Sequence, residues 1–315
     1  MIHLINLTKQ YDLPSGKSGQ ILAADRLNLE VPNREIFGLV GPNGAGKTTT
    51  LKMICGLQVP TSGRVTVNGV DVQREPEEAQ RHLGYLADFF SLYDDLRVWE
   101  YLDYFAHAYK MESIKIPQRV DEVIRRMNLE SKRDDPISGL SRGMKQRLGI
   151  GRAIIHDPPL IVLDEPAAGL DPKARVELKR LLKELNAEGK TIFITSHILA
   201  DLEEICTSIA IMEKGQLIRI GRLEEVMREA ASIRRIRIQL ASPEFALEEW
   251  LASQLGVQEP IGKGSEVEFG FTGNDAMLAE LVRELIGAGA PVCGVEKRTE
   301  TLERLYSRIS SGEVM

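Results

Sequence analysis

The sequence predicts an α/β fold with a large N-terminal domain and a small C-terminal one, and three observations support this. A strand-like run at residues 36–40 leads through a glycine-rich loop into a helix-like run at residues 49–55. A second apolar run, residues 160–163, is of the kind buried on both faces of a parallel sheet, and it ends in two carboxylates. The pattern of strands and helices changes after residue 229, and 315 residues are enough for two domains.

Composition and charge limit the possible classes of function. Apolar residues make up 43% of the chain and charged residues 27%, which is typical of a soluble globular protein. No apolar run approaches the ~20 residues that span a bilayer, and residues 1–4 lack a basic and apolar leader, so we expect a cytosolic location. The net charge of −6 argues against a nucleic-acid partner held by phosphate contacts. The three cysteines have neither a disulfide pattern nor a metal-ligand spacing.

The first segments predict an antiparallel β layer. Residues 2–8, 22–31 and 35–40 have the composition and alternation of strands, and the last of them leads into the glycine-rich loop. Tyr11 follows the first strand. It is either an aromatic that stacks on an adenine ring or a partly buried side chain at a strand end, and its position leaves both interpretations open.

The glycine-rich loop and the residue after it read Gly41-Pro42-Asn43-Gly44-Ala45-Gly46-Lys47-Thr48-Thr49. Glycines let backbone N–H groups turn inward around a polyphosphate, and the helix that follows adds the positive end of its dipole. We expect Lys47 to reach the β- and γ-phosphates and the Thr48 hydroxyl to bind magnesium. The sequence therefore predicts a phosphate-binding loop.

Helical periodicity follows, from about residue 94 to residue 128, and predicts an all-helical insert. Its aromatic residues are typical of a core, although an exposed part could dock a partner helix. Ser141 stands where another helix begins. It is a candidate N-cap, and a second anion site at the same helix end is the alternative.

Candidate catalytic residues stand at strand ends. Asp164 and Glu165 follow the buried strand, where two carboxylates are costly unless they serve a function. Asp164 is placed to hold magnesium, and Glu165 to orient and polarise the attacking water. His197 follows the strand at residues 191–194. Because parallel strand ends converge on the ligand crevice, His197 could approach the γ-phosphate.

These motifs in their order closely resemble the ATP-binding cassette of ABC transporters, over about residues 1–228. The matching segments are the phosphate loop, the Ser141 segment, Asp164-Glu165, Gly169-Leu170-Asp171 and His197. The resemblance implies a mixed-sheet core, an antiparallel β layer and a helical subdomain at about residues 88–150. It also implies ATP and Mg²⁺ as ligands.

Roles for single residues follow from the same resemblance. It implies that Tyr11 stacks on adenine and that Glu165 is the catalytic carboxylate. Ser141, Arg142 and Gly143 would form the signature that completes the ATP site of a second subunit. Asp171 would lie in the loop that links the two sites, and His197 would be the switch histidine at the γ-phosphate.

The chain departs from the usual cassette pattern at two places. The signature reads Leu-Ser-Arg-Gly-Met where Leu-Ser-Gly-Gly-Gln is usual, a variant similar to the type-2 exporter ATPase subgroup. The strand that ends at Leu86 normally leads into a glutamine that senses magnesium and contacts the membrane subunit, and Asp88 takes that place. A carboxylate can still meet the cation, directly or through water.

By resemblance, then, residues 1–230 are expected to be an ATPase that powers an exporter. It would work as a dimer, with a second copy of the chain as the expected partner, at the cytoplasmic face of the membrane beside a permease subunit on a separate chain. One alternative is a soluble cassette protein that acts on ribosomes or other machinery. Another is a nucleotide-controlled scaffold without turnover.

Residues 231–315 predict a small accessory domain. Their order of strand, helix, two strands, helix and strand suits a ferredoxin-like α/β unit, with a last helix at residues 301–310. They contain no catalytic constellation. A regulatory or dimer-supporting role and a stabilising appendage are both open.

Overall fold

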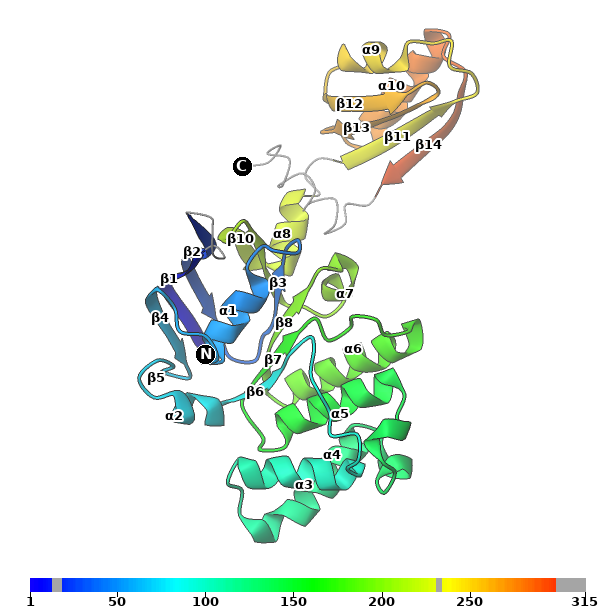
Figure 1. Cartoon of the computed structure of the whole chain (residues 1–315). Helices are drawn as coiled ribbons and strands as arrows, with labels where there is room; N and C mark the ends of the chain where they lie inside the picture. The colour runs from blue at the N-terminus through cyan, green and yellow to red at the C-terminus, as the bar shows by residue number, and fades with distance from the viewer. Residues whose placement is uncertain (13–18, 231–233, 299–315) are drawn as a thin grey trace. The chain divides into compact units, whose positions relative to one another are not determined.

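Two compact units make up the chain, residues 1–223 and 224–315. The structure, a computed structural model, describes residues 1–12, 19–230 and 234–298 (Figure 1). The predicted domain boundary after residue 230 lies at the end of helix α8 (Leu223–Ala230), whereas the division between the units falls at the start of that helix. No helix in the described residues is long and apolar enough to cross a membrane.

An antiparallel sheet begins the first unit, with strand order β2-β1-β4-β5. The strands are β1 (Ile2–Asp12), β2 (Gln20–Val31), β4 (Ser62–Val67) and β5 (Val70–Asp71). Strand β1 is longer than predicted, because it pairs with β2 as far as Asp12. Tyr11 therefore lies within the strand and not after its end.

A mixed sheet forms the centre of the first unit, with strand order β10-β9-β3-β8-β7-β6. The strands are β3 (Ile36–Val40), β6 (Leu83–Leu86), β7 (Leu160–Asp164), β8 (Thr191–Ser196), β9 (Ser208–Glu213) and β10 (Gln216–Arg222). All strands but β10 run parallel to their neighbours. Strands β3, β7 and β8 are buried along their whole length, as their apolar runs predict. Their carboxyl ends therefore meet at one edge of the sheet.

Helices cover the mixed sheet and form the insert. They are α1 (Lys47–Ile54), α2 (Pro76–Arg81), α3 (Val98–Ala108), α4 (Ile116–Arg126), α5 (Arg142–Ile154), α6 (Pro172–Ala187) and α7 (Leu199–Glu203), with 3₁₀ turns at Ser113–Lys115, Glu130–Lys132 and Ile137–Gly139. One hydrophobic cluster joins α1 to side chains of both sheets, for example Leu51 of α1, Leu4 of β1 and Val162 of β7. Helix α1 is thus anchored in the core at the point where the phosphate loop ends.

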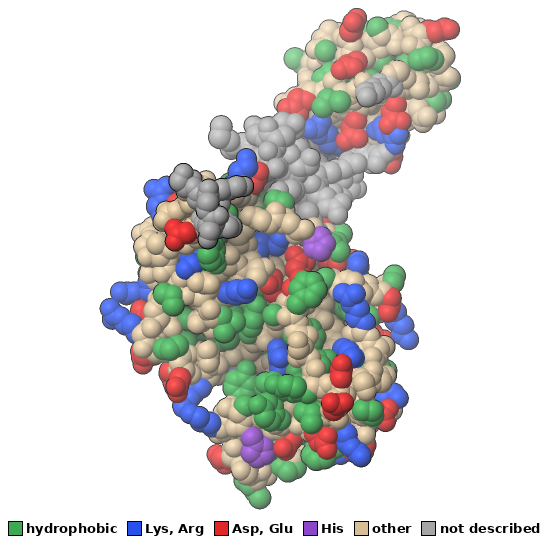
Figure 2. Space-filling view, viewed as in Figure 1, with side chains coloured by type: hydrophobic (Ala, Val, Ile, Leu, Met, Phe, Trp, Pro, Cys, Tyr) green, Lys and Arg blue, Asp and Glu red, His purple; other side chains and the backbone are tan. Residues whose placement is uncertain are grey.

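Aromatic side chains pack around α3 as the sequence predicts. Tyr101 is fully buried, and its ring centroid lies 4.9 Å from that of Phe105 and 6.1 Å from that of Tyr93. Tyr93 and Tyr104 are half exposed, and Phe89 is almost fully exposed. In Figure 2 hydrophobic side chains gather where β6 leads towards α3. The aromatic group is therefore partly core and partly surface.

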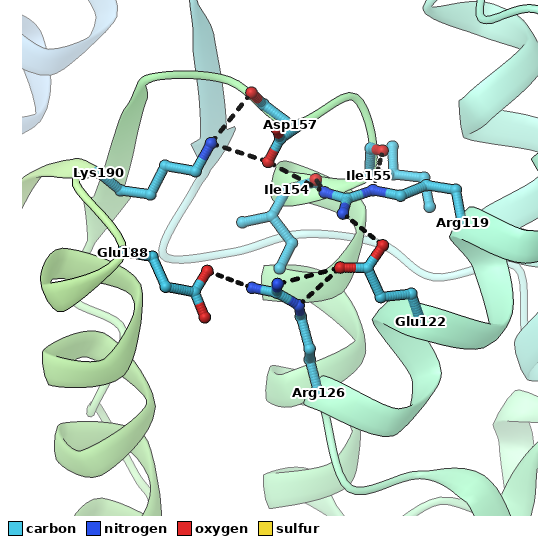
Figure 3. A network of polar contacts seen from close by, with 8 residues as sticks. All are labelled: Arg119, Glu122, Arg126, Ile154, Ile155, Asp157, Glu188 and Lys190. Carbon is cyan, nitrogen blue, oxygen red and sulfur yellow. Dashed lines mark hydrogen bonds and ion pairs between the residues drawn. The ribbon is translucent and has the colours of Figure 1, made fainter. Parts of the chain in front are cut away.

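A polar network joins α4 to the ends of α5 and α6 (Figure 3). The Arg119 guanidinium donates to the carbonyl oxygens of Ile154 (2.7 Å) and Ile155 (2.9 Å), at the C-terminal end of α5. Arg126 bonds to Glu122 on its own helix and to Glu188 at the end of α6. These contacts tie the helical insert to the rest of the unit at the end of α5 opposite Ser141.

Arg119→Ala should lower the free energy of unfolding by about 1–3 kcal/mol, because it leaves partly buried carbonyl groups of α5 without a charged donor. Urea denaturation measures the change. Arg180→Ala is the matched control, since Arg180 pairs with Glu184 on an exposed face and its loss should cost less than about 0.5 kcal/mol. Equal losses in the two variants would contradict the bracing role of Arg119.

His156 follows α5 and is held neutral. Its ring stacks on Tyr109, with 3.7 Å between ring centroids, and Nε2 lies 3.1 Å from the carbonyl oxygen of Leu83. Burial lowers the pKa of His156 from its ordinary 6.5 to about 4. As pH falls, the unfolded chain therefore takes up this proton before the folded chain does. The stability that depends on neutral His156 is complete above pH 6.5 and is lost as pH falls towards 4.

We expect acidification from pH 7.5 to pH 5 to cost the parent chain about 1–2 kcal/mol through His156. His156→Phe keeps the stacking surface and removes the titrating group, so its urea midpoint should fall less between these two pH values. His107→Gln, which changes an exposed histidine of α3, should fall as the parent does. An unchanged pH response of His156→Phe would assign the acid sensitivity to other groups.

The second unit is a four-stranded antiparallel sheet with helices on one face, as far as the structure describes it. Its elements are β11 (Arg234–Leu240), α9 (Leu247–Ala252), β12 (Val257–Lys263), β13 (Glu266–Phe271), α10 (Asp275–Gly287) and β14 (Val292–Arg298). The strand order β12-β13-β11-β14 is that of a ferredoxin-like unit, as predicted. Helix α9 is shorter than the segment 243–255 predicted for it, and the predicted helix 301–310 lies outside the described residues.

Candidate functional site

The phosphate loop lies between β3 and α1, pressed against main chain from two other strands. A Cβ atom on Gly41 would lie 2.1 Å from the carbonyl oxygen of Met212 in β9. A Cβ atom on Gly46 would lie 2.0 Å from the carbonyl oxygen of Ala23 in β2, and Gly46 has φ +106°. Only glycine fits at these two positions. The loop is therefore shaped by backbone contacts before any ligand binds.

Lys47 begins α1, and its side chain is only 6% exposed. Its ammonium group donates to the carbonyl oxygens of Gly41 (2.7 Å) and Pro42 (3.2 Å). It also lies 3.7 Å from Oε1 of Glu165. The cation is thus held over the loop, where phosphate oxygens can replace these partners.

The remaining loop residues differ in exposure. Pro42, Asn43, Gly44 and Thr48 are exposed, Ala45 is buried, and Thr49 is half-buried. The Thr48 hydroxyl therefore stands at the open side of the first turn of α1. Tyr11 is half-buried in β1, with the Lys9 ammonium 5.2 Å from its ring centroid.

Asp164 and Glu165 are joined through a residue that the sequence reasoning did not assign. Asp164 is 1% exposed and accepts a 2.6 Å hydrogen bond from the Thr195 hydroxyl. The same hydroxyl oxygen accepts from the backbone N–H of Glu165 at 3.0 Å. Asp164 and Thr195 stand opposite each other in the parallel register of β7 and β8. That register was the one signal that could have pointed to Thr195.

Glu165 and His197 form a close pair. The Glu165 carboxylate accepts from His197 Nδ1 at 2.7 Å and from its backbone N–H at 3.2 Å. Glu165 has φ +48°, which turns its side chain out of the line of β7 towards this partner. The Glu165 side chain is 12% exposed and that of His197 47%. The pair is open to a ligand on the His197 side.

Asp88 follows β6 and shares the electrostatic field of these carboxylates. Partial burial raises the pKa of Asp88, and the negative charges of Asp164 and Glu165 raise it further. A cation placed among these carboxylates would remove this repulsion.

The oxygen donors suit magnesium that is held together with phosphate. The structure, over the residues it describes, contains no group of three or more His, Cys, Asp or Glu side chains that could hold a metal by themselves. Mg²⁺ is commonly bound by one or two carboxylates with substrate phosphates and water. Asp164, the Thr48 hydroxyl and Asp88 are donors of that kind, and the glycine-shaped loop beside them fits a polyphosphate.

The signature residues lie at a different place. The Ser141 hydroxyl accepts from the Met144 N–H and caps α5, and Asp171 caps α6 through the Ala174 N–H. Ser141, Gly143 and Asp171 line a shallow depression of about 170 Å³, and none of residues 41–49 lines it. Arg142 lies beside it and bonds to Ala168. One chain therefore brings together Lys47, Asp164, Glu165 and His197, but not the signature.

Comparison with known families and solved structures gives consistent matches. A family model described as "ABC transporter" matches residues 24–168. A Nod factor export ATP-binding protein I from Cupriavidus metallidurans is 38% identical over 66% of this chain and 69% of its own length. A probable multidrug ABC transporter ATP-binding protein, YbhF, from Escherichia coli is 37% identical over 69% of this chain but 37% of its own length.

Solved structures agree with these relatives. An ATP-binding subunit of an ABC transporter aligns with a TM-score of 0.64 and 31% identity, over 73% of this chain and 93% of its own. The ATP-binding cassette MJ0796, described as a dimeric post-hydrolysis state with ADP and Pi, aligns with a TM-score of 0.64 and 28% identity, over 71% of this chain and 99% of its own.

Proposed function

The chain belongs to the family of ABC transporter ATP-binding proteins, and from that premise we propose that it hydrolyses ATP to power an exporter whose membrane-spanning subunit is a separate polypeptide. One observation carries the proposal. Lys47, the Asp164–Thr195 pair and the Glu165–His197 pair meet at the carboxyl ends of β3, β7 and β8. This arrangement supplies a phosphate cation, a magnesium ligand and a base for water at one edge of the sheet.

In this proposal each side chain has a separate task. The loop N–H groups and Lys47 bind the phosphates, and Lys47 gives up its loop carbonyl oxygens to do so. Glu165 accepts a proton from the attacking water, while His197 holds the carboxylate in place. Thr48, Asp164 and Asp88 would hold Mg²⁺, which when bound offsets the negative charge of the phosphates. Tyr11 would contact the adenine.

We propose a head-to-tail dimer as the working form. The depression at Ser141, Gly143 and Asp171 excludes the phosphate-loop residues of its own chain, so it can complete only the site of another subunit. A second copy of this chain satisfies this requirement at both sites, in an isologous arrangement. The MJ0796 cassette is described as dimeric, which supports the same arrangement here.

The membrane partner would dock on the exposed aromatic surface formed by Phe89, Tyr93 and Tyr104. Single exposed aromatic residues are common, but three around one loop and helix are typical of an interaction surface. Docking there would place the subunit at the cytoplasmic face of the membrane.

Co-purification tests the transport function against a cassette that acts on ribosomes. The tagged chain, expressed in its own cells and extracted in mild detergent, should bring down an integral membrane protein. A Phe89→Ser, Tyr104→Ser variant should lose it while keeping ATPase activity. Sedimentation with ribosomes and no membrane partner would overturn the proposal in favour of the alternative. Absence of phosphate release by the purified chain would favour a nucleotide-controlled scaffold.

We also propose that residues 231–315 form an accessory domain that folds independently of the cassette. Its own hydrophobic core, which includes Ile238, Phe269 and Leu281, supports this. A chain ending at residue 230 should therefore stay soluble and bind ATP with unchanged affinity. Size-exclusion chromatography and ATP titration measure both properties. Insoluble protein would make the tail part of the cassette fold, whereas altered turnover or dimerisation would favour the regulatory role over the appendage.

A further inference from the structure

Arg142 replaces the usual signature glycine, and its side chain has a defined place. Its Nη2 donates to the carbonyl oxygen of Ala168 at 3.0 Å. Its guanidinium also lies over Gly169, where a Cβ atom would be 2.2 Å from Cζ. Gly169 has φ +67° as well. Both the space for the guanidinium and the backbone conformation beneath it therefore require glycine at residue 169.

The segment that Arg142 holds runs from Glu165 to the cap of α6. The backbone N–H of Ala168 donates to the carbonyl oxygen of Glu165 at 3.0 Å, and Asp171 ends the loop as the N-cap of α6. Arg142 thus joins the first turn of the signature helix to the loop between the catalytic carboxylate and Asp171. A glycine at residue 142 could make no such bond.

We propose that Arg142 is a positioning residue that fixes loop 165–171 to the start of α5, so that Ser141 and Asp171 meet a second subunit as one preformed surface. The inference rests on the proposed head-to-tail dimer. Two segments that are already ordered relative to each other lose less conformational freedom when the dimer closes than two independent ones. Arg142 should therefore favour closure and leave ATP binding by a single subunit unchanged.

The direct test is dimerisation in the Glu165→Gln background, in which ATP is retained. With ATP and no magnesium, Arg142→Ala should raise the dimer dissociation constant about 3- to 10-fold in analytical ultracentrifugation. The affinity of the dilute monomer for a fluorescent ATP analogue should not change. Arg142→Lys should recover part of the loss, since an ammonium group can still donate to the Ala168 carbonyl. Arg180→Ala is the matched control on an exposed face of α6 and should dimerise as the parent does.

Two further measurements isolate the contact itself. Hydrogen exchange at the amides of Ala168 and Leu170 should become several-fold faster in monomeric Arg142→Ala, because the loop loses its link to α5. Gly169→Ala should displace the guanidinium. In a double-mutant cycle its effect on dimerisation should be smaller when Arg142 is already alanine.

The outcomes separate the two proposals. If Glu165→Gln does not dimerise with ATP at all, the head-to-tail dimer is wrong and the role of Arg142 falls with it. If Glu165→Gln dimerises and Arg142→Ala does so equally well, with unchanged amide exchange, only the role of Arg142 is wrong.

Discussion

Glu165→Gln is expected to bind ATP and to hydrolyse it at least about 10²-fold more slowly than the parent chain. The amide keeps the size of the side chain, and its oxygen can still accept from the His197 N–H. It loses the carboxylate charge that orients water and takes its proton. Phosphate release and ATP titration of the purified chain measure the two effects. Glu184→Gln, an exposed carboxylate of α6, is the matched control and should retain the parent rate.

The same variant should reveal the dimer. ATP that is held and not hydrolysed shifts the population to the state that binds it, so ATP without magnesium should shift Glu165→Gln to a dimer in size-exclusion chromatography. ADP should return it to the monomer. Asp164→Asn should fail differently, by impaired binding of magnesium-ATP itself, because Asp164 is the buried carboxylate of the magnesium site. Hydrolysis by Glu165→Gln at the parent rate would disprove the role of Glu165 as base. An inactive variant that never dimerises would leave that role intact and make the sandwich depend on the membrane partner.

Lys47→Ala should weaken ATP binding and lower turnover by at least about 10²-fold, because it removes the cation that meets the β- and γ-phosphates. In the parent chain this ammonium group is already held by the Gly41 and Pro42 carbonyl oxygens and lies beside Glu165. The site therefore loses a preorganised charge and not a flexible surface cation. The cassette should remain folded, since loop carbonyl groups near the surface can bond to water.

Lys52→Ala is the matched control for Lys47→Ala, because Lys52 is an exposed lysine of the same helix. It should keep the parent values of ATP affinity and turnover. The urea midpoints of both variants should stay close to that of the parent. Unchanged ATPase activity in Lys47→Ala would overturn the assignment of the phosphate loop.

The sequence alone determined the parts of the site that depend on local chemistry. The phosphate loop was readable because left-handed backbone and close approach demand glycine, and residues 41–48 are contiguous between a strand and a helix. The position of Asp164 and Glu165 at a strand end was readable for the same reason, since the apolar run before them marks a buried parallel strand. The ferredoxin-like tail followed from the order of its elements.

Only the tertiary structure decided which distant groups meet. Thr195 bridges Asp164 and Glu165 because β7 and β8 pair in one register, and a shift of that register would separate them. The contact of Lys47 with Glu165 and that of Arg142 with Ala168 depend on how separate loops pack after the sheet has formed. Residue spacing contains a local conformational preference, but contacts between segments far apart in the chain arise from packing of the whole unit.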